Sequence, residues 1–356
     1  MKKKVAFLIP NLIEGSGGIR TIINYMNYLI EKDYECHAYV EGKSNIFNLI
    51  EEAENYFGIN GINFHSGWKV DEPFDLVVAT IWYSAKIVAD LPFNCHKAYL
   101  IQDFEALFNP MGDAFLLAEN SYQYGLHHLT LGRWLPTVLN EKFNVYSRYF
   151  DFGADKNIYY KDDSVKKEEL SVAFIFQPEK PRRCYQIGLS ALKILKSELP
   201  DIKIYLYGSN EKVDIPFEHV NLGILKLGEI RKLYNQCSVG LCISSSNPSR
   251  IPFEMMACGL PVVDVYMNNN LYDFPEQGVL LAQPFPNSIA KALKMVLLDN
   301  NLRREMSNGG INFMLNRDMK NEFEKFAEAV DSIFNNDFNN HMVGKMPILY
   351  KKNPII

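Results

Sequence analysis

The chain has 356 residues, which at roughly 150 residues per domain corresponds to about two domains. Hydrophobic residues make up 47% and charged residues 22%, an ordinary globular composition that excludes a disordered or collagen-like chain. The net charge of −5 argues against a general nucleic-acid-binding protein. None of the six cysteines forms a C-x-x-C pair, so we expect free thiols in a reducing compartment, with no disulfide framework and no zinc site.

The N-terminus begins like a signal peptide, with three lysines followed by the apolar run 5–9. This run ends at Pro10 and is shorter than the apolar region of about 7–15 residues that a signal peptide needs. No window approaches the roughly 18 consecutive apolar residues of a membrane span. We therefore expect a cytoplasmic protein. Peripheral association with the inner face of the cell membrane is the alternative location.

Short runs rich in β-branched and aromatic residues recur along the chain, and longer amphipathic stretches lie between them. The predicted strands are 5–9, 36–40, 76–80, 98–101, 172–176, 204–207, 239–243, 261–265 and 279–281. The predicted helices are 18–31, 185–199, 227–236, 252–258, 289–298 and 320–334. Continuous apolar runs suit strands that are buried on both faces, as in a parallel sheet. The alternation predicts an α/β protein with doubly wound domains.

The pattern breaks once, near the middle of the chain. Turn residues at 151–155 are followed by a charged stretch at 161–169, and a new strand then begins. We predict a first domain over residues 1–160 and a second over 161–318. Residues 319–356 form a helix that returns to the first domain, followed by a tail.

A glycine-rich loop lies between the first predicted strand and the first predicted helix. Gly15, Gly17 and Gly18 allow the backbone to approach a ligand, and the helix N-terminus offers N–H groups to an anion or a hydroxyl. Arg20 replaces the third glycine of the dinucleotide-binding pattern. A tight turn without a ligand is the alternative interpretation.

Other catalytic patterns fail on spacing or are absent. Tyr28 and Lys32 have the spacing of a short-chain dehydrogenase pair, but on the first helix they are expected to form a solvated face. There is no G-x-S-x-G or H-E-x-x-H sequence. His127 and His128 are adjacent, so on a helix their rings would point to different faces.

The second half carries the strongest group of chemically active residues. In the turn 177–183, Lys180, Arg182 and Arg183 follow a predicted strand, at a place where cations can neutralise a diphosphate. A solvated basic turn is the alternative. Further along, the polar segment 244–250 opens a short helix with Glu254 in its first turn, where the helix dipole favours a carboxylate that can accept hydrogen bonds from a diol.

The segment that starts at Glu254, E-M-M-A-C-G-L-P-V-V, resembles the E-A-M-A-C-G-L-P-V-V segment of GT-B glycosyltransferases of family 4. Residues 151–160 resemble the family's interdomain stretch, and residues 320–334 its C-terminal helix. Within the family, residues 177–183, 102–105 and 109–112 are most similar to WsaF-type rhamnosyltransferases of bacterial surface-glycan assembly. The resemblance covers nearly the whole chain and implies two Rossmann-like domains that face a cleft.

The resemblance also assigns roles in donor binding. Glu254 matches the second glutamate of the family's E-x7-E motif, which binds the donor ribose. Ser246 stands where the first glutamate is expected, and residues 247–249 replace its G-F-G. The resemblance therefore leaves open how the donor sugar is held and which sugar it is. The donor-binding candidates are Glu254, Arg250, Lys180, Arg182, Arg183, Ser246, Ser249 and Gly208.

In the first domain, Gln102 and Asp103 end a predicted strand where many family members place a His or Asp facing the donor sugar. The resemblance implies that Asp103 or Glu105 holds hydroxyls of the sugar or of the acceptor. Asp103 would take the proton of the acceptor; a helix N-cap is the alternative. The catalytic candidates are Asp103, Glu105 and Arg250, and the candidates of the glycine loop are Gly15, Gly17, Gly18 and Arg20. Tyr83, next to Trp82, and the stretch 122–128 are candidates for the acceptor side, with core packing as the alternative.

The resemblance implies transfer of a hexose from a nucleotide sugar, with dTDP-rhamnose as the leading donor, to a growing and lipid-linked saccharide. The reaction is expected to retain anomeric configuration, with no metal, no other cofactor and no nucleic-acid partner. Two alternatives remain: a non-catalytic partner that binds a nucleotide sugar or glycan, and a dinucleotide-dependent sugar oxidoreductase. The altered glycine loop argues against the second.

Overall fold

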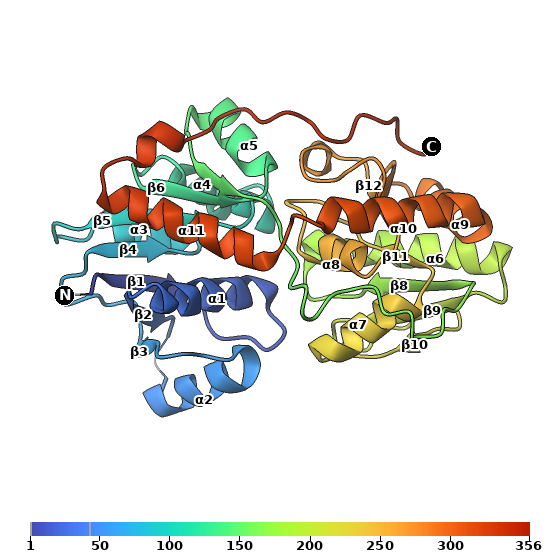
Figure 1. Ribbon diagram of the computed structural model, residues 1–356, viewed down its shortest axis with the longest axis horizontal. Helices are drawn as coiled ribbons and strands as arrows, with labels where there is room; N and C mark the ends of the chain where they lie inside the picture. The colour runs from blue at the N-terminus through green and yellow to red at the C-terminus, as the bar shows by residue number, and fades with distance from the viewer. Residues whose placement is uncertain (1, 43) are drawn as a thin grey trace. The chain divides into compact units, whose positions relative to one another are not determined.

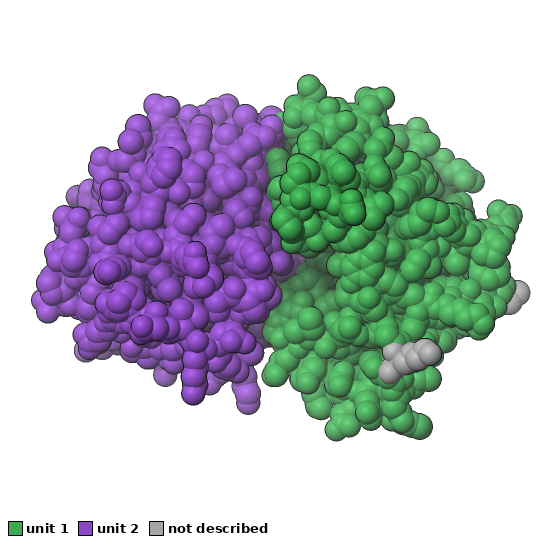
Figure 2. Space-filling view, turned by 180° about the vertical axis from the view of Figure 1, so that it is seen from behind, with its two compact units in different colours: residues 1–151, 322–346 green, residues 152–321, 347–356 purple. Residues whose placement is uncertain are grey.

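The computed structural model describes residues 2–42 and 44–356. The chain forms two compact units, which Figure 2 distinguishes by colour. The first unit comprises residues 1–151 and 322–346, and the second comprises residues 152–321 and 347–356.

The first unit is built on a seven-stranded sheet of order β3-β2-β1-β4-β5-β6-β7 (Figure 1). Every neighbouring pair is parallel. Its strands are β1 (Lys4–Ile9), β2 (Glu35–Val40), β3 (Asn63–Ser66), β4 (Leu76–Ala79), β5 (His96–Ile101), β6 (His127–Leu131) and β7 (Arg148–Phe150). The apolar run of β1 is fully buried, as the sequence pattern predicts for a central parallel strand.

The helices of the first unit include one from the far end of the chain. They are α1 (Gly17–Glu31), α2 (Ile46–Phe57), α3 (Trp82–Ala89), η1 (Glu105–Phe108), α4 (Asp113–Ser121), α5 (Trp134–Phe143), α11 (Met319–Phe334) and η4 (Phe338–His341). Helix α11 packs on α1, because Tyr25 stacks on Phe326 with ring centroids 4.1 Å apart. The Tyr25 hydroxyl also donates to the buried carboxylate of Glu322.

The second unit is built on a six-stranded sheet of order β10-β9-β8-β11-β12-β13, again with parallel pairs. Its strands are β8 (Ser171–Ile175), β9 (Lys203–Tyr207), β10 (Val220–Asn221), β11 (Val239–Leu241), β12 (Val262–Val265) and β13 (Val279–Ala282). Its helices are η2 (Pro181–Arg183), α6 (Tyr185–Glu198), α7 (Leu227–Gln236), α8 (Ile251–Ala257), η3 (Asn268–Leu271), α9 (Pro286–Leu298) and α10 (Asn300–Met314).

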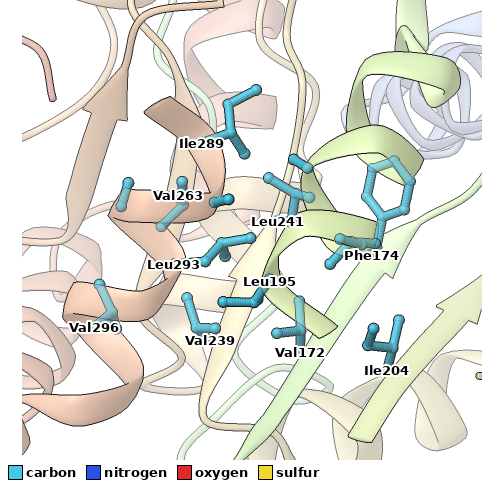
Figure 3. Packing of buried hydrophobic residues seen from close by; sticks show 14 of the residues in the cluster. Val172, Phe174, Leu195, Ile204, Val239, Leu241, Val263, Ile289, Leu293 and Val296 are labelled. Carbon is cyan, nitrogen blue, oxygen red and sulfur yellow. The ribbon is translucent and has the colours of Figure 1, made fainter. Parts of the chain in front are cut away.

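The core of the second unit lies between this sheet and helices α6 and α9 (Figure 3). Leu195 of α6 and Leu293 of α9 are fully buried in the same cluster as Val172 and Leu241 of the sheet. Helix α6 approaches the sheet closely, because a Cβ at Gly188 would lie 2.2 Å from the ring of Phe174. This packing fixes where the loop between β8 and α6 leaves the sheet.

The predicted fold class, α/β with two doubly wound parallel sheets, is confirmed. The assumption that His127 and His128 lie on a helix is wrong, because both belong to strand β6. Residues 152–160, which we expected in the first domain, belong to the second unit, where Ala154 pairs with Asp318. The tail, which the sequence left unassigned, belongs to the first unit as far as residue 346; beyond that the chain packs on the second unit, where Ile355 pairs with Ala282.

Candidate functional site

The candidate site lies at the carboxyl ends of the strands of the second sheet, at the point where the strand order reverses. Strand β8 lies between β9 and β11, so the strand order reverses between β8 and β11, and such a reversal is the usual ligand position in open parallel sheets. The basic turn (residues 177–183) follows β8, and the serine loop (residues 242–250) follows β11. The Ser245 hydroxyl donates to the carbonyl of Arg182 at 2.8 Å. The structure therefore brings these two predicted segments together.

The basic turn concentrates three cations at a short 3-10 helix: Lys180 precedes η2, and Arg182 and Arg183 belong to it. Lys180 lies 3.9 Å from Glu179, the one acidic residue of the turn. Burial lowers the pKa of Lys180, and the charge of Arg183 lowers it further. Within the described residues, the buried Nε of Arg183 has no hydrogen-bond partner. The turn thus holds more positive charge than Glu179 neutralises, as an anion-binding turn requires.

Gly208 follows β9 and lies beside the basic turn. Its φ of 105° lies in the region that glycine favours. A Cβ there would lie 2.5 Å from Cδ1 of Ile175. Its carbonyl accepts a 3.3 Å hydrogen bond from Nε2 of Gln177. Close packing against the end of β8 is therefore sufficient to explain this glycine, whose role in donor binding stays a prediction.

The serine loop ends at Arg250, which precedes α8. Nη1 of Arg250 donates to the carbonyl of Gly153 at 3.2 Å, so this side chain ties the loop to the first residues of the second unit. Ser246 is buried and Ser249 is partly exposed. Ser246 is therefore shielded by burial and Arg250 is held by Gly153, whereas Ser249 remains partly exposed.

Glu254 lies in the first turn of α8, as the sequence pattern predicts. The buried hydroxyls of Tyr207 and Tyr234 are hydrogen-bonded to each other at 2.8 Å. Burial raises the pKa of Tyr234, and the charges of Tyr207 and then Glu254 add to this effect. The charge of Glu254 also raises the pKa of Tyr207, so this carboxylate acts electrostatically on both hydroxyls of the pair.

Sequence reasoning missed three buried polar residues beneath the serine loop: Asp264, Asn269 and Asn270. Asp264 interrupts an apolar strand, and a charged residue within such a run is the signal that could have revealed it. The two asparagines lie in η3, where a short polar run reads as an ordinary loop.

In the first unit, the glycine loop forms the start of α1. The Oγ atom of Ser16 accepts a hydrogen bond from the Ile19 N–H at 3.4 Å, which caps the helix. Gly15 has a φ of 72°, and the Gly18 carbonyl accepts from Nε2 of Gln102 at 3.2 Å. A Cβ at Gly17 would meet no described atom within 4 Å, so the space beside Gly17 is open to a ligand.

Arg20 does not face this loop. Its Nη2 donates to the carbonyl of Tyr56 at 2.8 Å, and its guanidinium lies 5.5 Å from the centre of the Phe57 ring. The side chain therefore holds α2 against α1, and a role of Arg20 in the glycine loop stays a prediction.

Asp103 and Glu105 follow β5 but differ in what they contact. Asp103 is partly exposed, and its Oδ1 accepts from the N–H of Phe104 at 2.8 Å. Glu105 is 3% exposed, and its Oε2 accepts from the Tyr99 hydroxyl and the Trp82 N–H. Glu105 thus holds the start of α3, and its catalytic role stays a prediction.

An aromatic cluster (Trp68, Trp82 and Tyr83) lies at the carboxyl edge of the first sheet. The ring of Tyr83 lies 5.3 Å from that of Trp68 and 5.2 Å from that of Trp82. Nε1 of Trp68 donates to the carbonyl of Ile9, and the Tyr83 hydroxyl donates to Glu41 at 3.0 Å. All three rings are partly exposed, so this cluster can receive the apolar face of a sugar.

The stretch 122–128 is mainly structural. Tyr122 is fully buried and stacks on Phe104, which supports the core-packing alternative. His128 is 5% exposed, and burial followed by the charge of His127 lowers its pKa to about 4. A pocket of about 470 Å³ lies beside them, lined by Tyr122, Gln123, Gly125, Leu126, His127, His128, Phe143, Val145, Tyr146, Phe338, Asn339 and Met342.

One group of side chains in the described residues could hold a metal ion. Its members are His37, His65 and Glu72, whose ligand atoms lie within 4.8 Å of one another. Nδ1 of His37 and Nε2 of His65 are hydrogen-bonded at 2.9 Å, and Nε2 of His37 bonds to Glu35 at 2.9 Å. Because both nitrogens of His37 already have partners, the group is satisfied without an ion.

One protein-family model matches part of the second unit of this chain. The family described as "WsaF, C-terminal domain" matches residues 170–294, which contain both the basic turn and the serine loop. The O-antigen biosynthesis protein RfbC of Myxococcus xanthus is 30% identical over 239 residues. The match covers 65% of this chain and 19% of RfbC, so the chain spans about a fifth of that relative's length.

Three solved structures of similar fold are named as glycosyltransferases or hold UDP-glucose. HepE of Anabaena in complex with UDP-glucose has a TM-score of 0.71 and 14% identity over 92% of this chain and 99% of HepE. WaaG, a glycosyltransferase involved in lipopolysaccharide biosynthesis, has a TM-score of 0.69 and 12% identity over 91% and 98% of the two chains. This chain has the GT-B glycosyltransferase fold. The glycosyltransferase from Rickettsia africae has a TM-score of 0.65 and 12% identity over 94% and 99% of the two chains.

Across residues 2–42 and 44–356, no helix combines the length and apolar character that crossing a membrane would require.

Proposed function

We propose that this chain is a glycosyltransferase of bacterial surface-glycan assembly, which transfers a hexose from a nucleotide sugar to a saccharide. The observation that carries the proposal is the hydrogen bond between Ser245 and Arg182. It joins the cation-rich turn to the loop before Glu254, at the strand-order reversal of a GT-B fold and within the WsaF-like region. The O-antigen role of RfbC supports the assignment to surface glycans.

In this proposal the second unit binds the donor. Lys180, Arg182 and Arg183 neutralise the diphosphate, and Glu254 accepts hydrogen bonds from the ribose hydroxyls. dTDP-rhamnose is the proposed donor, because the WsaF family match coincides with the donor-binding segments. Since Ser246 replaces the family's first glutamate, we expect weaker contacts to the sugar than to the nucleotide.

The first unit binds the acceptor in this proposal. The aromatic cluster provides faces on which a pyranose ring can stack. Asp103 takes the proton of the attacking acceptor hydroxyl. The acceptor is lipid-linked, and the protein works at the cytoplasmic face of the membrane without spanning it.

The proposed reaction retains anomeric configuration. The acceptor hydroxyl attacks the anomeric carbon on the face from which the diphosphate departs. The bond from that carbon to the diphosphate oxygen breaks, and its electron pair leaves with the nucleotide. The cations of the basic turn stabilise the departing charge, so positioning and electrostatics supply the catalysis without a metal ion.

The first test is calorimetric titration of the purified protein with dTDP, UDP, GDP and ADP, beside Glu254→Ala. We expect dTDP to bind most tightly and the substitution to weaken it at least about tenfold, the loss typical of hydrogen bonds to a charged group. A transfer assay with dTDP-rhamnose follows. Preference for UDP would overturn the proposed donor but keep the enzyme class, and inversion in the product would overturn the retaining mechanism.

Binding without turnover by every donor would favour a non-catalytic nucleotide-sugar-binding protein. The replacement of the first motif glutamate by Ser246 is the observation that favours this second candidate. Failure of all four nucleotides to bind would remove the donor site altogether.

A further inference from the structure

Beneath the serine loop, a carboxylate is buried in the middle of a parallel strand. Asp264 lies in β12, and its exposed fraction is 0%. Placing a carboxylate in such a position costs free energy unless it accepts strong hydrogen bonds. Burial accordingly raises the pKa of Asp264 to about 6, although the groups that contact it act in the opposite direction.

Ser244 supplies two of the three hydrogen bonds to this carboxylate. Oδ1 of Asp264 accepts from the Ser244 N–H at 2.8 Å, and Oδ2 accepts from the Ser244 hydroxyl at 2.7 Å. The third comes from the N–H of Val265 at 2.7 Å. Hydrogen bonds to an ionised acceptor are roughly twice as strong as neutral ones. The first polar residue of the serine loop is therefore held by Asp264.

Two carboxamides continue this support along the loop. The Ser244 carbonyl accepts from Nδ2 of Asn269 at 2.9 Å and from Nδ2 of Asn270 at 3.0 Å. Nδ2 of Asn269 also donates to the Ser246 carbonyl. Nδ2 of Asn270 reaches the Val265 carbonyl at 2.7 Å, which anchors the carboxamide to β12. Side chains thus satisfy the loop backbone beyond the end of β11, where sheet pairing stops.

The charge of the basic turn also acts on this carboxylate. The positive charge of Arg183 acts on Asp264 and opposes the effect of burial on its pKa. At the next residue of the loop, the Ser245 hydroxyl bonds to the carbonyl of Arg182. Asp264 therefore lies where it can hold the serine loop and attract the basic turn at once.

We propose that Asp264, with Asn269 and Asn270, is a positioning group that holds the serine loop against the basic turn, and that nucleoside-diphosphate affinity depends on it. The consequence for affinity rests on the proposed function, whereas the anchoring of the loop does not. None of the three residues contacts the nucleotide in this proposal; they act through the loop and the cations.

Asp264→Asn tests the anchoring directly. The substituted amide keeps the volume, and its oxygen can still accept from the two N–H groups that Oδ1 accepts from. Its NH2 group cannot accept from the Ser244 hydroxyl, and the negative charge that strengthens all three hydrogen bonds is lost. In hydrogen–deuterium exchange of the nucleotide-free protein, we expect the segment 242–250 to exchange at least about tenfold faster. Ser244→Ala is the milder variant, because it removes one hydrogen bond and keeps the carboxylate.

Ser171→Ala is the matched control. Its hydroxyl is also buried and bonds to the Glu168 carbonyl at 2.7 Å, but it lies at the amino end of β8, the opposite edge of the sheet. We expect this control to lower stability without faster exchange in the segment 242–250. Nucleoside-diphosphate binding, by calorimetry with dTDP and UDP, should weaken about tenfold in Asp264→Asn and remain within twofold in the control.

Unchanged loop exchange in folded Asp264→Asn and Ser244→Ala would overturn the anchoring. Faster loop exchange with unchanged affinity would overturn its importance for binding. If the wild-type protein bound neither nucleotide, the proposed function and the link to affinity would fail together, and loop exchange would still decide the anchoring.

Discussion

The Ser245 hydroxyl and the Arg182 carbonyl lie 2.8 Å apart and form a hydrogen bond. This bond joins the two loops that leave the reversal point of the second sheet, and it does so through the backbone of a residue that carries one of the three cations. The position of the basic turn therefore depends on the serine loop, and each of the two can be tested through the other.

Removing this bond should weaken nucleotide binding without removing any charge. We expect Ser245→Ala to weaken nucleoside-diphosphate binding about three- to tenfold, the value of one ordinary hydrogen bond. Calorimetry measures the change. Ser197→Ala is the control, because its exposed hydroxyl bonds to the Ile194 carbonyl within α6; equal affinities in the two variants would contradict this prediction.

The cations of the basic turn should account for the salt dependence of binding. Arg183, whose buried Nε has no hydrogen-bond partner within the described residues, is expected to bind the diphosphate. Arg183→Ala should weaken binding at least about tenfold and reduce its dependence on ionic strength. Lys193→Ala removes the same charge from an exposed position on α6. A salt dependence that is the same in both variants would refute the assignment.

The aromatic cluster of the first unit should affect the acceptor and not the donor. We expect Trp82→Ala to raise the KM for the acceptor about tenfold, because ring stacking on a sugar is lost. The Kd for the nucleotide should stay within twofold. The comparison is Tyr146→Ala, which removes an exposed ring of the same unit. A change in nucleotide affinity with an unchanged acceptor KM would assign the cluster to the donor instead.

Acid should destabilise the protein through His128. Burial holds its folded-state pKa near 4, whereas an unfolded histidine has a pKa near 6.5. The unfolded state therefore binds more protons, and stability is lost as the pH falls from about 6.5 towards 4. The contribution is roughly 3 kcal/mol at about 1.4 kcal/mol per pKa unit.

Urea denaturation at several pH values measures this effect. We expect His128→Gln to lose less stability than the wild-type protein between pH 7 and pH 4. Comparing the pH slopes cancels any constant loss from the substitution itself. Parallel slopes would show that His128 is not the group responsible.

The strands that the sequence predicts are those with continuous apolar runs, such as β1 and β8. Strand β6 begins with His127 and His128, and β7 has only three residues, so neither has the apolar run that marks a buried strand. The charge cluster of the basic turn and the place of Glu254 in the first turn of α8 were also visible locally, because each depends on neighbours in the chain.

Other site assignments could not be made locally. Glu105 turns inward because a backbone N–H at the start of α3 and the hydroxyl of Tyr99 are both within its reach. Arg20 bonds to the Tyr56 carbonyl, and Arg250 to that of Gly153. Each partner comes from another element of the fold, so the spacing of residues along the chain carries no signal of it.

The sequence by itself determined the alternation of strands and helices, and the segments in which charge and polar groups follow strands, because these features follow from local periodicity. Only the tertiary structure decided that β11 pairs with β8, and that choice placed the serine loop beside the basic turn. It also placed Asp264, Asn269 and Asn270 beneath the loop. The reason is physical: a buried polar group takes its hydrogen-bond partners from the neighbouring strand, and strand order is set by the packing of the whole sheet.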